Sequence, residues 1–118
     1  MASVVNIRKA HLREQGYVDL QDWLKDPKHL YIGREMSFYV AGAKASKWMN
    51  PYPVKQYGLE KSLQLYEAHV RKNLYDQLDE LDGLTLGCWC KPDPCHGDVL
   101  IRLLSEKKGL LLNPRNSL

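Results

Sequence analysis

Short apolar runs alternate with segments of helical periodicity along this chain, and that alternation limits its fold more than any other feature. The runs Val4–Ile7, Leu30–Ile32 and Leu84–Trp89 have the apolar, β-branched or aromatic composition of buried strands. Strands separated by helical segments are typical of α/β domains. We therefore expect a small single α/β domain with a mixed or mostly parallel sheet and flanking helices.

Helical spacing is strongest between residues 59 and 74, where apolar residues recur at intervals of three or four with charged residues between them. Asp93-Pro94 is typical of a helix start, because aspartate caps the first turn and proline suits the first helical position. We expect this last helix to end at Gly109. A shorter helix or turn is expected over residues 19–23, and a long loop over residues 40–53.

Length and composition fit one globular domain: the chain has 118 residues, of which 44% are hydrophobic and 26% charged. We expect the domain to span residues 1–112 and the tail 113–118 to be frayed. No signal peptide and no apolar run of membrane-spanning length is visible, so we expect a cytoplasmic protein without membrane contact. The net charge of +3 favours phosphate-bearing partners without requiring them.

The three cysteines of the chain are all found in one short stretch, Gly87-Cys88-Trp89-Cys90-Lys91-Pro92-Asp93-Pro94-Cys95-His96-Gly97-Asp98. Thiols grouped with an imidazole and a carboxylate favour either a metal site or an activated nucleophile. An odd number of cysteines argues against a disulfide framework, and Cys-x-Cys is a poor spacing for a bridge. We expect reduced thiols.

Two functional interpretations of this stretch compete. In the first, Cys88, Cys90 and Cys95 bind zinc, with His96 or a distant histidine as the fourth ligand. In the second, Cys95 is a nucleophile whose pKa is lowered by a helix N-terminus, and His96 or Asp98 handles protons. Buried packing of Cys88 and Cys90 is a third, non-functional alternative.

Basic residues occur at two further places. Arg8 follows the first strand, and ligands of α/β folds bind at the C-terminal ends of strands. Lys47, Trp48 and Asn50 lie in the long loop, where a lysine beside an exposed indole suits a phosphate and a stacked base. Trp48 is as compatible with a place in the core as with such a site.

The Cys/His stretch through Leu100 resembles the hallmark of the domain of unknown function 4326, a family of bacterial, phage and large DNA virus proteins. Further pieces agree in order: Val5-Asn6-Ile7-Arg8, Tyr31-Ile32-Gly33-Arg34, Ser46-Lys47-Trp48 and Asn50-Pro51. Met49 stands where the family usually has glycine. The resemblance implies one pocket built from these polar residues, and its viral distribution associates the family with nucleotides or nucleic acids.

These observations together predict a pocket beside the Cys/His stretch that binds a phosphate-bearing ligand, a nucleotide or nucleic acid, through Arg8, Arg34, Lys47, Trp48 and Asn50. As an enzyme, the protein would process that ligand with Cys95, His96 or Asp98. The alternative is a zinc-stabilised nucleic-acid-binding module without catalysis, in which the cysteines are structural.

Overall fold

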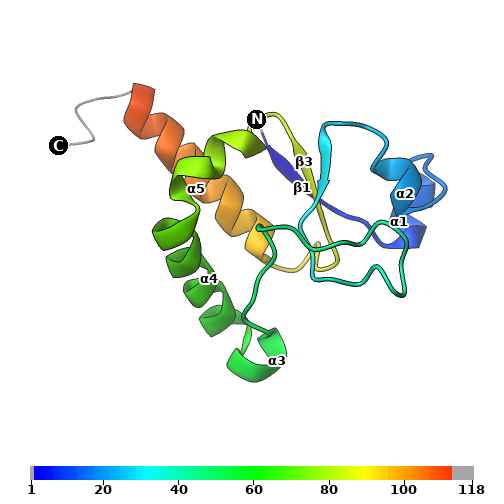
Figure 1. Ribbon diagram of the computed structural model, residues 1–118, viewed down its shortest axis with the longest axis horizontal. Helices are drawn as coiled ribbons and strands as arrows, with labels where there is room; N and C mark the ends of the chain where they lie inside the picture. The colour runs from blue at the N-terminus through cyan, green and yellow to red at the C-terminus, as the bar shows by residue number, and fades with distance from the viewer. Residues whose placement is uncertain (1, 113–118) are drawn as a thin grey trace.

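A three-stranded parallel sheet forms the centre of the computed structural model, which describes residues 2–112 and side chains up to residue 109 (Figure 1). Strands β1 (Ser3–Asn6) and β2 (His29–Tyr31) both pair in parallel with the central strand β3 (Thr85–Cys88). The predicted α/β class and the positions of the strands are confirmed. The sheet is parallel throughout the described part of the chain.

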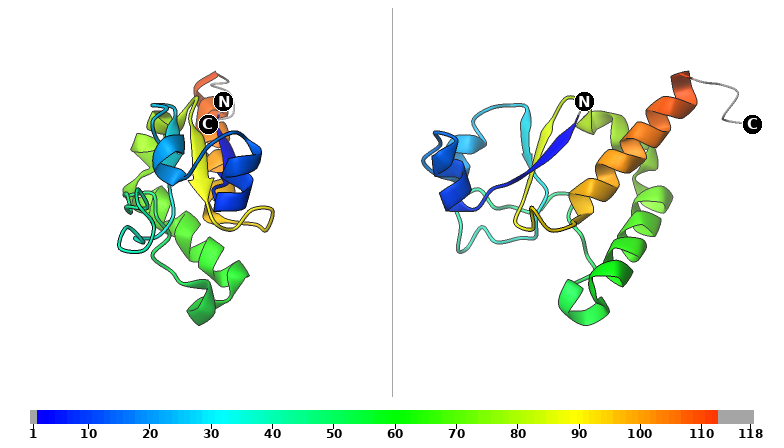
Figure 2. Two further views of the ribbon diagram at one scale, coloured as in Figure 1. Left: turned by 90° about the vertical axis from the view of Figure 1, so that its right-hand side faces the viewer. Right: turned by 180° about the vertical axis from the view of Figure 1, so that it is seen from behind.

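Helices cover both faces of the sheet (Figures 1 and 2). The segments α4, η1 and α5 lie against one face, and α1 and α2 lie on the other. Their bounds in chain order are α1 (Lys9–Glu14), α2 (Leu20–Trp23), α3 (Val54–Tyr57), α4 (Leu59–Asn73), the 3-10 helix η1 (Tyr75–Leu81) and α5 (His96–Leu112). The long loop expected between residues 40 and 53 is irregular, as predicted.

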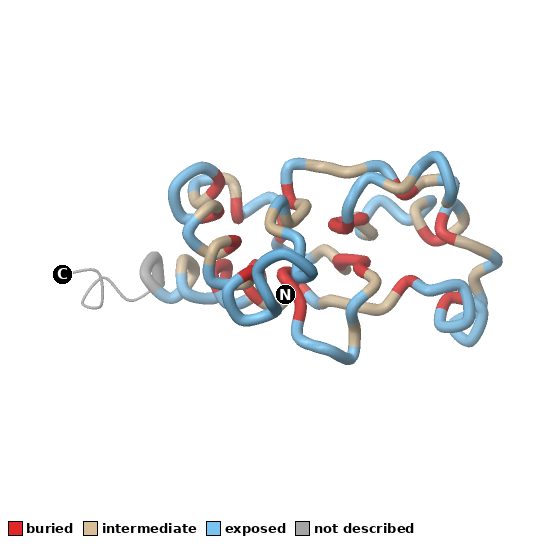
Figure 3. Tube along the Cα trace, turned by 90° about the horizontal axis from the view of Figure 1, so that it is seen from below, coloured by how far each residue is buried: buried red, intermediate tan, exposed pale blue. Residues whose placement is uncertain are grey.

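The sheet separates two hydrophobic cores because successive side chains of a strand point to opposite faces. Leu86 and Cys88 of β3 belong to the larger core, which they share with α4, η1 and α5. Tyr31 of β2 belongs to the smaller core, against α1 and α2, and Trp89 packs on it. Buried segments accordingly gather in the interior in Figure 3, while the outer turns of the chain are exposed.

Glycine permits the close approach of α5 to the sheet. A Cβ atom added at Gly97, in the first turn of α5, would lie 2.8 Å from Val4 and 3.0 Å from Ile32. Gly97 is therefore needed for contact between this helix and the two outer strands. Gly109, farther along α5, has nothing within 4 Å of the corresponding position.

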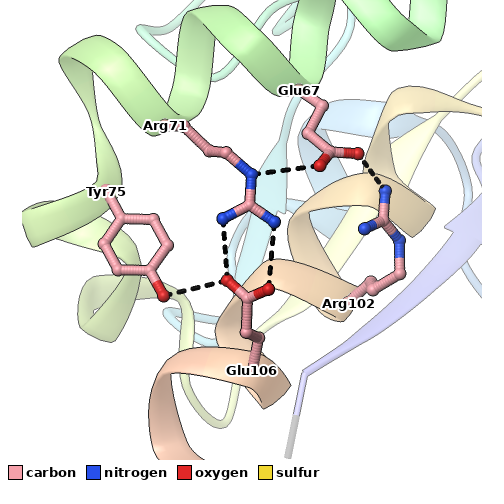
Figure 4. A network of polar contacts seen from close by, with 5 residues as sticks. All are labelled: Glu67, Arg71, Tyr75, Arg102 and Glu106. Atoms are coloured by element: carbon pink, nitrogen blue, oxygen red, sulfur yellow. Dashed lines mark hydrogen bonds and ion pairs between the residues drawn. The ribbon is translucent and has the colours of Figure 1, made fainter. Parts of the chain in front are cut away.

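A network of charged side chains joins α4 to α5 on the outer surface (Figure 4). The guanidinium of Arg71 donates two hydrogen bonds of 2.9 Å to Glu106 and one of 3.0 Å to Glu67. Arg102 also donates to Glu67, and the hydroxyl of Tyr75 donates to Glu106. These contacts lower the pKa of the Glu67 and Glu106 carboxyl groups. Because the hydrogen bonds connect α4 to α5, they also fix the register of these two helices.

The structure corrects the expected bounds of the last helix. Asp93 is not its N-cap: its amide donates to the Cys90 carbonyl at 2.9 Å within a turn flanked by two prolines, and α5 begins at His96. The helix also continues past Gly109 to Leu112. The sequence analysis missed α1 and α3, because such short helices contain too few apolar residues to show a period. The predicted tail 113–118 lies outside the described residues.

Alanine substitutions of the two glycines of α5 are expected to have opposite effects on stability. We predict that Gly97→Ala lowers the free energy of unfolding by about 1–2 kcal/mol, since the added methyl group overpacks the contact with β1 and β2. Gly109→Ala should raise it by up to about 1 kcal/mol through helix propensity. Urea unfolding of both variants measures this, and equal effects of the two substitutions would contradict the close approach.

Candidate functional site

The loop that follows β3 is held at the C-terminal edge of the sheet by the loops that follow the other two strands. The amide of Ile7 donates to the Cys88 carbonyl, and the amide of Ile32 donates to the Gly87 carbonyl, both at 3.0 Å. The side chain of Asn6 donates to the Lys91 carbonyl and accepts from the Arg8 amide at 2.7 Å. Asn6 thereby ties Arg8 to the cysteine-containing loop.

Two of the three thiols face each other in the core. Cys88 ends β3, Cys95 immediately precedes α5, and both are buried, with their Sγ atoms 3.3 Å apart. Trp89, between strand and loop, points to the opposite face, where its indole N–H donates to the Tyr31 hydroxyl at 2.8 Å. Trp89 thus packs on the smaller core, on the face opposite to that of Cys88.

Cys90 is the exposed thiol of the cluster and the one most disposed to ionise. A hydrogen bond from the Cys88 thiol, together with the nearby charge of Arg8, lowers the pKa of Cys90 to about 7, against the opposing effect of burial. At neutral pH a substantial fraction of Cys90 is therefore thiolate, the form that acts as nucleophile or metal ligand.

The order of acidity differs from the expectation that Cys95 is the most ionised thiol. Its hydrogen bond to Cys88 and its burial raise the pKa of Cys95, although the backbone amides of Gly97 and Asp98 act in the opposite direction. The pKa of Cys88 is also raised, mainly by its hydrogen bond to Cys90. Cys95 does precede a helix N-terminus, but the hydrogen bond to Cys88 and desolvation in the core together outweigh its effect on the pKa of Cys95.

His96 is buried and anchors the start of α5 to the end of β2. Its Nε2 lies 2.7 Å from the carbonyl oxygen of Ile32, so Nε2 carries the proton and donates it. Burial lowers the pKa of His96, which is consequently neutral at pH 7. The ring also stands edge-on to Tyr66, at a centroid distance of 5.1 Å. This predicted catalytic residue therefore has one nitrogen committed to structure.

Asp98 closes the first turn of α5. Its carboxylate accepts a hydrogen bond from the Cys95 amide at 3.0 Å and from the ammonium of Lys91. The Cys95 carbonyl in turn accepts from the Asp98 amide at 3.0 Å, which makes a reciprocal cap of the capping-box kind. Asp98, which was predicted to be catalytic, thus holds the loop in place, as His96 does.

The four predicted zinc ligands do not form one coordination sphere in this conformation. His96 is turned to the Ile32 carbonyl, and Cys90 lies on the surface while its two partners are buried. Within residues 2–112 no group of three or more histidine, cysteine or acidic side chains is placed to hold a metal ion.

The predicted basic pocket is divided between two parts of the molecule. The ammonium of Lys47 pairs with Glu80 at 2.8 Å, beside a cavity of about 430 Å³ near Leu84, at the start of β3. Arg8 lies at the other end of that strand, beside Cys90. Lys47 and Arg8 therefore do not share one phosphate site at the end of β3.

Trp48 and Asn50 have structural roles. Trp48 is only 2% exposed, and its carbonyl accepts from the hydroxyl of Tyr66 at 2.7 Å, so its indole belongs to the core and cannot stack on a base. The side chain of Asn50 donates to Ser62 and accepts from the Tyr52 amide, both at 2.9 Å. The expectation that these two side chains bind ligand is corrected: they pin the long loop to α4.

Exposed aromatic residues occur instead between β2 and the long loop of residues 40–53. Phe38 and Tyr39 are 91% and 81% exposed and contact each other edge to face at 5.2 Å. Arg34, in the same segment, is also exposed. The sequence analysis missed this aromatic pair, although adjacent aromatics between Ser37 and the glycine-containing turn could have indicated exposed rings.

Comparison with known proteins identifies the family. The model of the family called domain of unknown function (DUF4326) matches residues 18–106. The chain belongs to the DUF4326 family. The predicted resemblance is thus confirmed, and the matched range includes the whole cysteine-containing loop.

Two viral relatives are similar to this DUF4326 chain, and neither has an assigned activity. An uncharacterised protein of Acanthamoeba polyphaga mimivirus is 34% identical over 84 residues, which cover 63% of this chain and 65% of that protein. An uncharacterised protein from the nrdA-td intergenic region of Enterobacteria phage T4 is 40% identical over 46 residues, 39% of this chain and 35% of the phage protein. This chain therefore spans less than two thirds of either relative. No solved structure matches it.

The helices of the DUF4326 chain were also compared with the requirements of a membrane span. Among the described residues, no helix is both long enough and apolar enough to cross a membrane.

Selective alkylation is expected to identify Cys90 as the reactive thiol. With iodoacetamide on native protein, we predict one fast-reacting thiol with a half-maximal rate near pH 7, because the pKa of Cys90 is lowered to about 7. The two buried thiols should react slowly. Cys90→Ser should remove the fast phase. Arg8→Gln should move its midpoint to higher pH, whereas Arg13→Gln, in the helix α1 that follows Arg8, serves as control. A midpoint near pH 9 would contradict this assignment.

Proposed function

We propose that the chain binds a phosphate-bearing ligand, a nucleotide or nucleic acid, at the C-terminal edge of the sheet and presents the Cys90 thiolate to it as a nucleophile. The observation that carries the proposal is the exposed thiol at the end of the central strand, next to Arg8. Ligands of open α/β sheets bind outside the carboxyl ends of the strands. A guanidinium in that position suits a phosphate, which it binds with two parallel hydrogen bonds.

The charges around the loop favour the Arg8 side as the place of the phosphate. A second cavity, of about 420 Å³, lies on the other side, between α4 and the start of α5, and is lined by Glu60, Glu67 and Asp98 with Arg102. Carboxylates predominate there and would repel an anion. The first turn of α5 is capped by Asp98, which competes with any anion for its amides.

Residue roles follow from this placement. Cys90 takes the nucleophilic role expected of Cys95, because Cys90 is exposed whereas Cys95 is buried. His96 and Asp98 act as positioning residues that hold the loop against β2 and α5. Lys91, hydrogen-bonded to Asp98, keeps its positive charge beside the thiols, and this contact raises the pKa of Lys91.

A single-stranded nucleic acid fits the wider surface better than a lone nucleotide does. Lys9, His11 and Arg13 on α1 are exposed and continue the basic character of Arg8, while the exposed aromatic pair Phe38 and Tyr39 offers faces for base stacking. A cytoplasmic location belongs to the same proposal, because the reducing cytoplasm keeps thiols free.

Ligand binding should depend on Arg8. We expect a fluorescent single-stranded DNA oligonucleotide to bind the protein at low salt, with affinity that falls as salt is added. Arg8→Gln should weaken binding about tenfold, since a charge-assisted hydrogen bond contributes about 1.5–3 kcal/mol. Fluorescence anisotropy measures this, and ATP tested as competitor separates a nucleotide site from an extended surface.

Matched variants make the binding result specific. Lys47→Gln should bind as the unmodified protein does, because Lys47 is already neutralised by Glu80. Phe38→Ala should weaken the oligonucleotide and leave ATP unaffected. Bound ligand should also slow alkylation of Cys90. If Arg8→Gln and Lys47→Gln bound the oligonucleotide with equal affinity, the phosphate site would not be at the C-terminal edge of the sheet.

The alternative proposal is a zinc-stabilised nucleic-acid-binding module. It is favoured by the 3.3 Å approach of the Cys88 and Cys95 sulfur atoms and by the backbone amides directed at each of them, which suit sulfur that carries negative charge. Cys90 would be a third ligand after a movement of the loop. Because His96 is held by Ile32, the fourth ligand would come from elsewhere.

Metal content separates the two proposals. A thiol nucleophile predicts protein that, purified without chelator, contains far less than one zinc per chain and melts at the same temperature with and without EDTA. A structural zinc site predicts about one zinc per chain and a lower melting temperature after chelation, because binding energy of the metal contributes to folding. Elemental analysis and differential scanning calorimetry give both readouts.

A further inference from the structure

The two buried thiols are close enough to form a covalent bond after a small movement. Their Sγ atoms are 3.3 Å apart, and a disulfide requires about 2.0 Å, so a shift of about 1.3 Å suffices. Cys88 ends the central strand, and Cys95 directly precedes α5. Each thiol is at most 2% exposed, so neither is directly accessible to an oxidant in solution.

Cys90 connects this buried pair to the surface. It is exposed, lies two residues from Cys88, and is near enough to the Cys88 thiol for that thiol to lower the pKa of Cys90. Cys88 is in turn in contact with Cys95. The three sulfur atoms thus form a chain in the order Cys90, Cys88, Cys95, from solvent to core.

We propose that the three cysteines carry out thiol–disulfide exchange with a low-molecular-weight disulfide, entering at Cys90 and ending in a Cys88–Cys95 disulfide. Its basis is the geometry of the thiols, and it does not depend on the ligand proposed above. This exchange would give the three cysteines a redox activity in addition to the nucleophilic role proposed for Cys90.

The exchange proceeds in three balanced steps. The Cys90 thiolate attacks one sulfur of the small disulfide, forms a mixed disulfide and releases one small thiolate. The Cys88 sulfur, after losing its proton to solvent, attacks Cys90 and releases the second small thiolate. Because Cys-x-Cys is a poor spacing for a bridge, the Cys88–Cys90 bond is short-lived. Cys95 loses its proton, attacks Cys88 and frees the Cys90 thiolate, and the protons of Cys88 and Cys95 end on the two small thiolates. The net reaction oxidises two protein thiols and reduces one small disulfide to two thiols.

The end state has two structural consequences. The new bond joins the end of β3 to the start of α5 and closes the loop between them. Cys90 is again a free, exposed thiol, so the nucleophile of the proposed function survives oxidation. Oxidation should also raise the melting temperature, since the bond restricts the unfolded chain.

The test uses the full chain after removal of metal with EDTA. Protein is equilibrated in glutathione buffers of increasing disulfide fraction, quenched with acid, and alkylated in denaturant. Cleavage after Trp89 and before Asp93 puts the three cysteines on separate peptides for mass spectrometry. We expect a Cys88–Cys95 linkage with alkylated Cys90. A folded protein that forms no such linkage at any ratio, or only Cys88–Cys90, overturns the proposal.

The variant Cys90→Ser tests the entry step. Position 90 is exposed, and circular dichroism checks that the variant is folded. It should reach the same Cys88–Cys95 disulfide at a rate lower by at least about tenfold, because the buried thiols then react only when the structure opens. Oxidation at the unmodified rate would overturn the proposed exchange. In the variant Cys95→Ser, the exchange should stop at the mixed disulfide of glutathione with Cys90 or at the Cys88–Cys90 disulfide. Lys47→Gln, whose ammonium is paired with Glu80 away from the thiols, should oxidise at the unmodified rate. Because the linkage is read without oligonucleotide or ATP, a failed ligand proposal leaves this result intact.

Discussion

The parallel pairing of β3 with both β1 and β2 is the constraint on which the rest of the structure depends. It places the ends of all three strands at one edge, so that the loops after them meet there. It also buries β3 from both faces, with Leu86 in one core and Gly87 against the other. A residue that follows β3 is therefore held by both neighbouring strands, which gives the cysteine-containing loop a fixed position.

The burial that stabilises this edge also assigns different roles to the three thiols. Cys88 and Cys95 lie in the larger core, where desolvation disfavours a charge. Cys90 follows the end of β3 by two residues and is exposed to solvent. The pKa values of Cys88 and Cys95 are raised while that of Cys90 is lowered, which concentrates thiolate character at Cys90. Nucleophilic attack on the ligand and disulfide exchange would both begin at this same sulfur atom.

Local sequence patterns predicted the strands, α4 and the importance of the cysteine stretch, because period and composition act over a few residues. They did not predict the choice among the cysteines, since burial depends on where the strand ends and which helix covers it. Trp48 illustrates the same limit. An indole beside lysine suits either a base or a core, and only its burial in the folded chain, at 2% exposure, decides between them. Asp93-Pro94 was misleading because a second proline, Pro92, keeps the segment in a turn.

The residues at the C-terminal edge of the sheet can be divided by the contacts they make in this fold. Asn6, His96 and Gly97 secure contacts between loop, strand and helix, and a change at any of them would move the thiols. Arg8 and Cys90 make no comparable contribution to the core, and both side chains face solvent. Folding alone does not require an exposed thiol and an exposed guanidinium at the C-terminal edge of the sheet. That pair is where chemistry is to be sought.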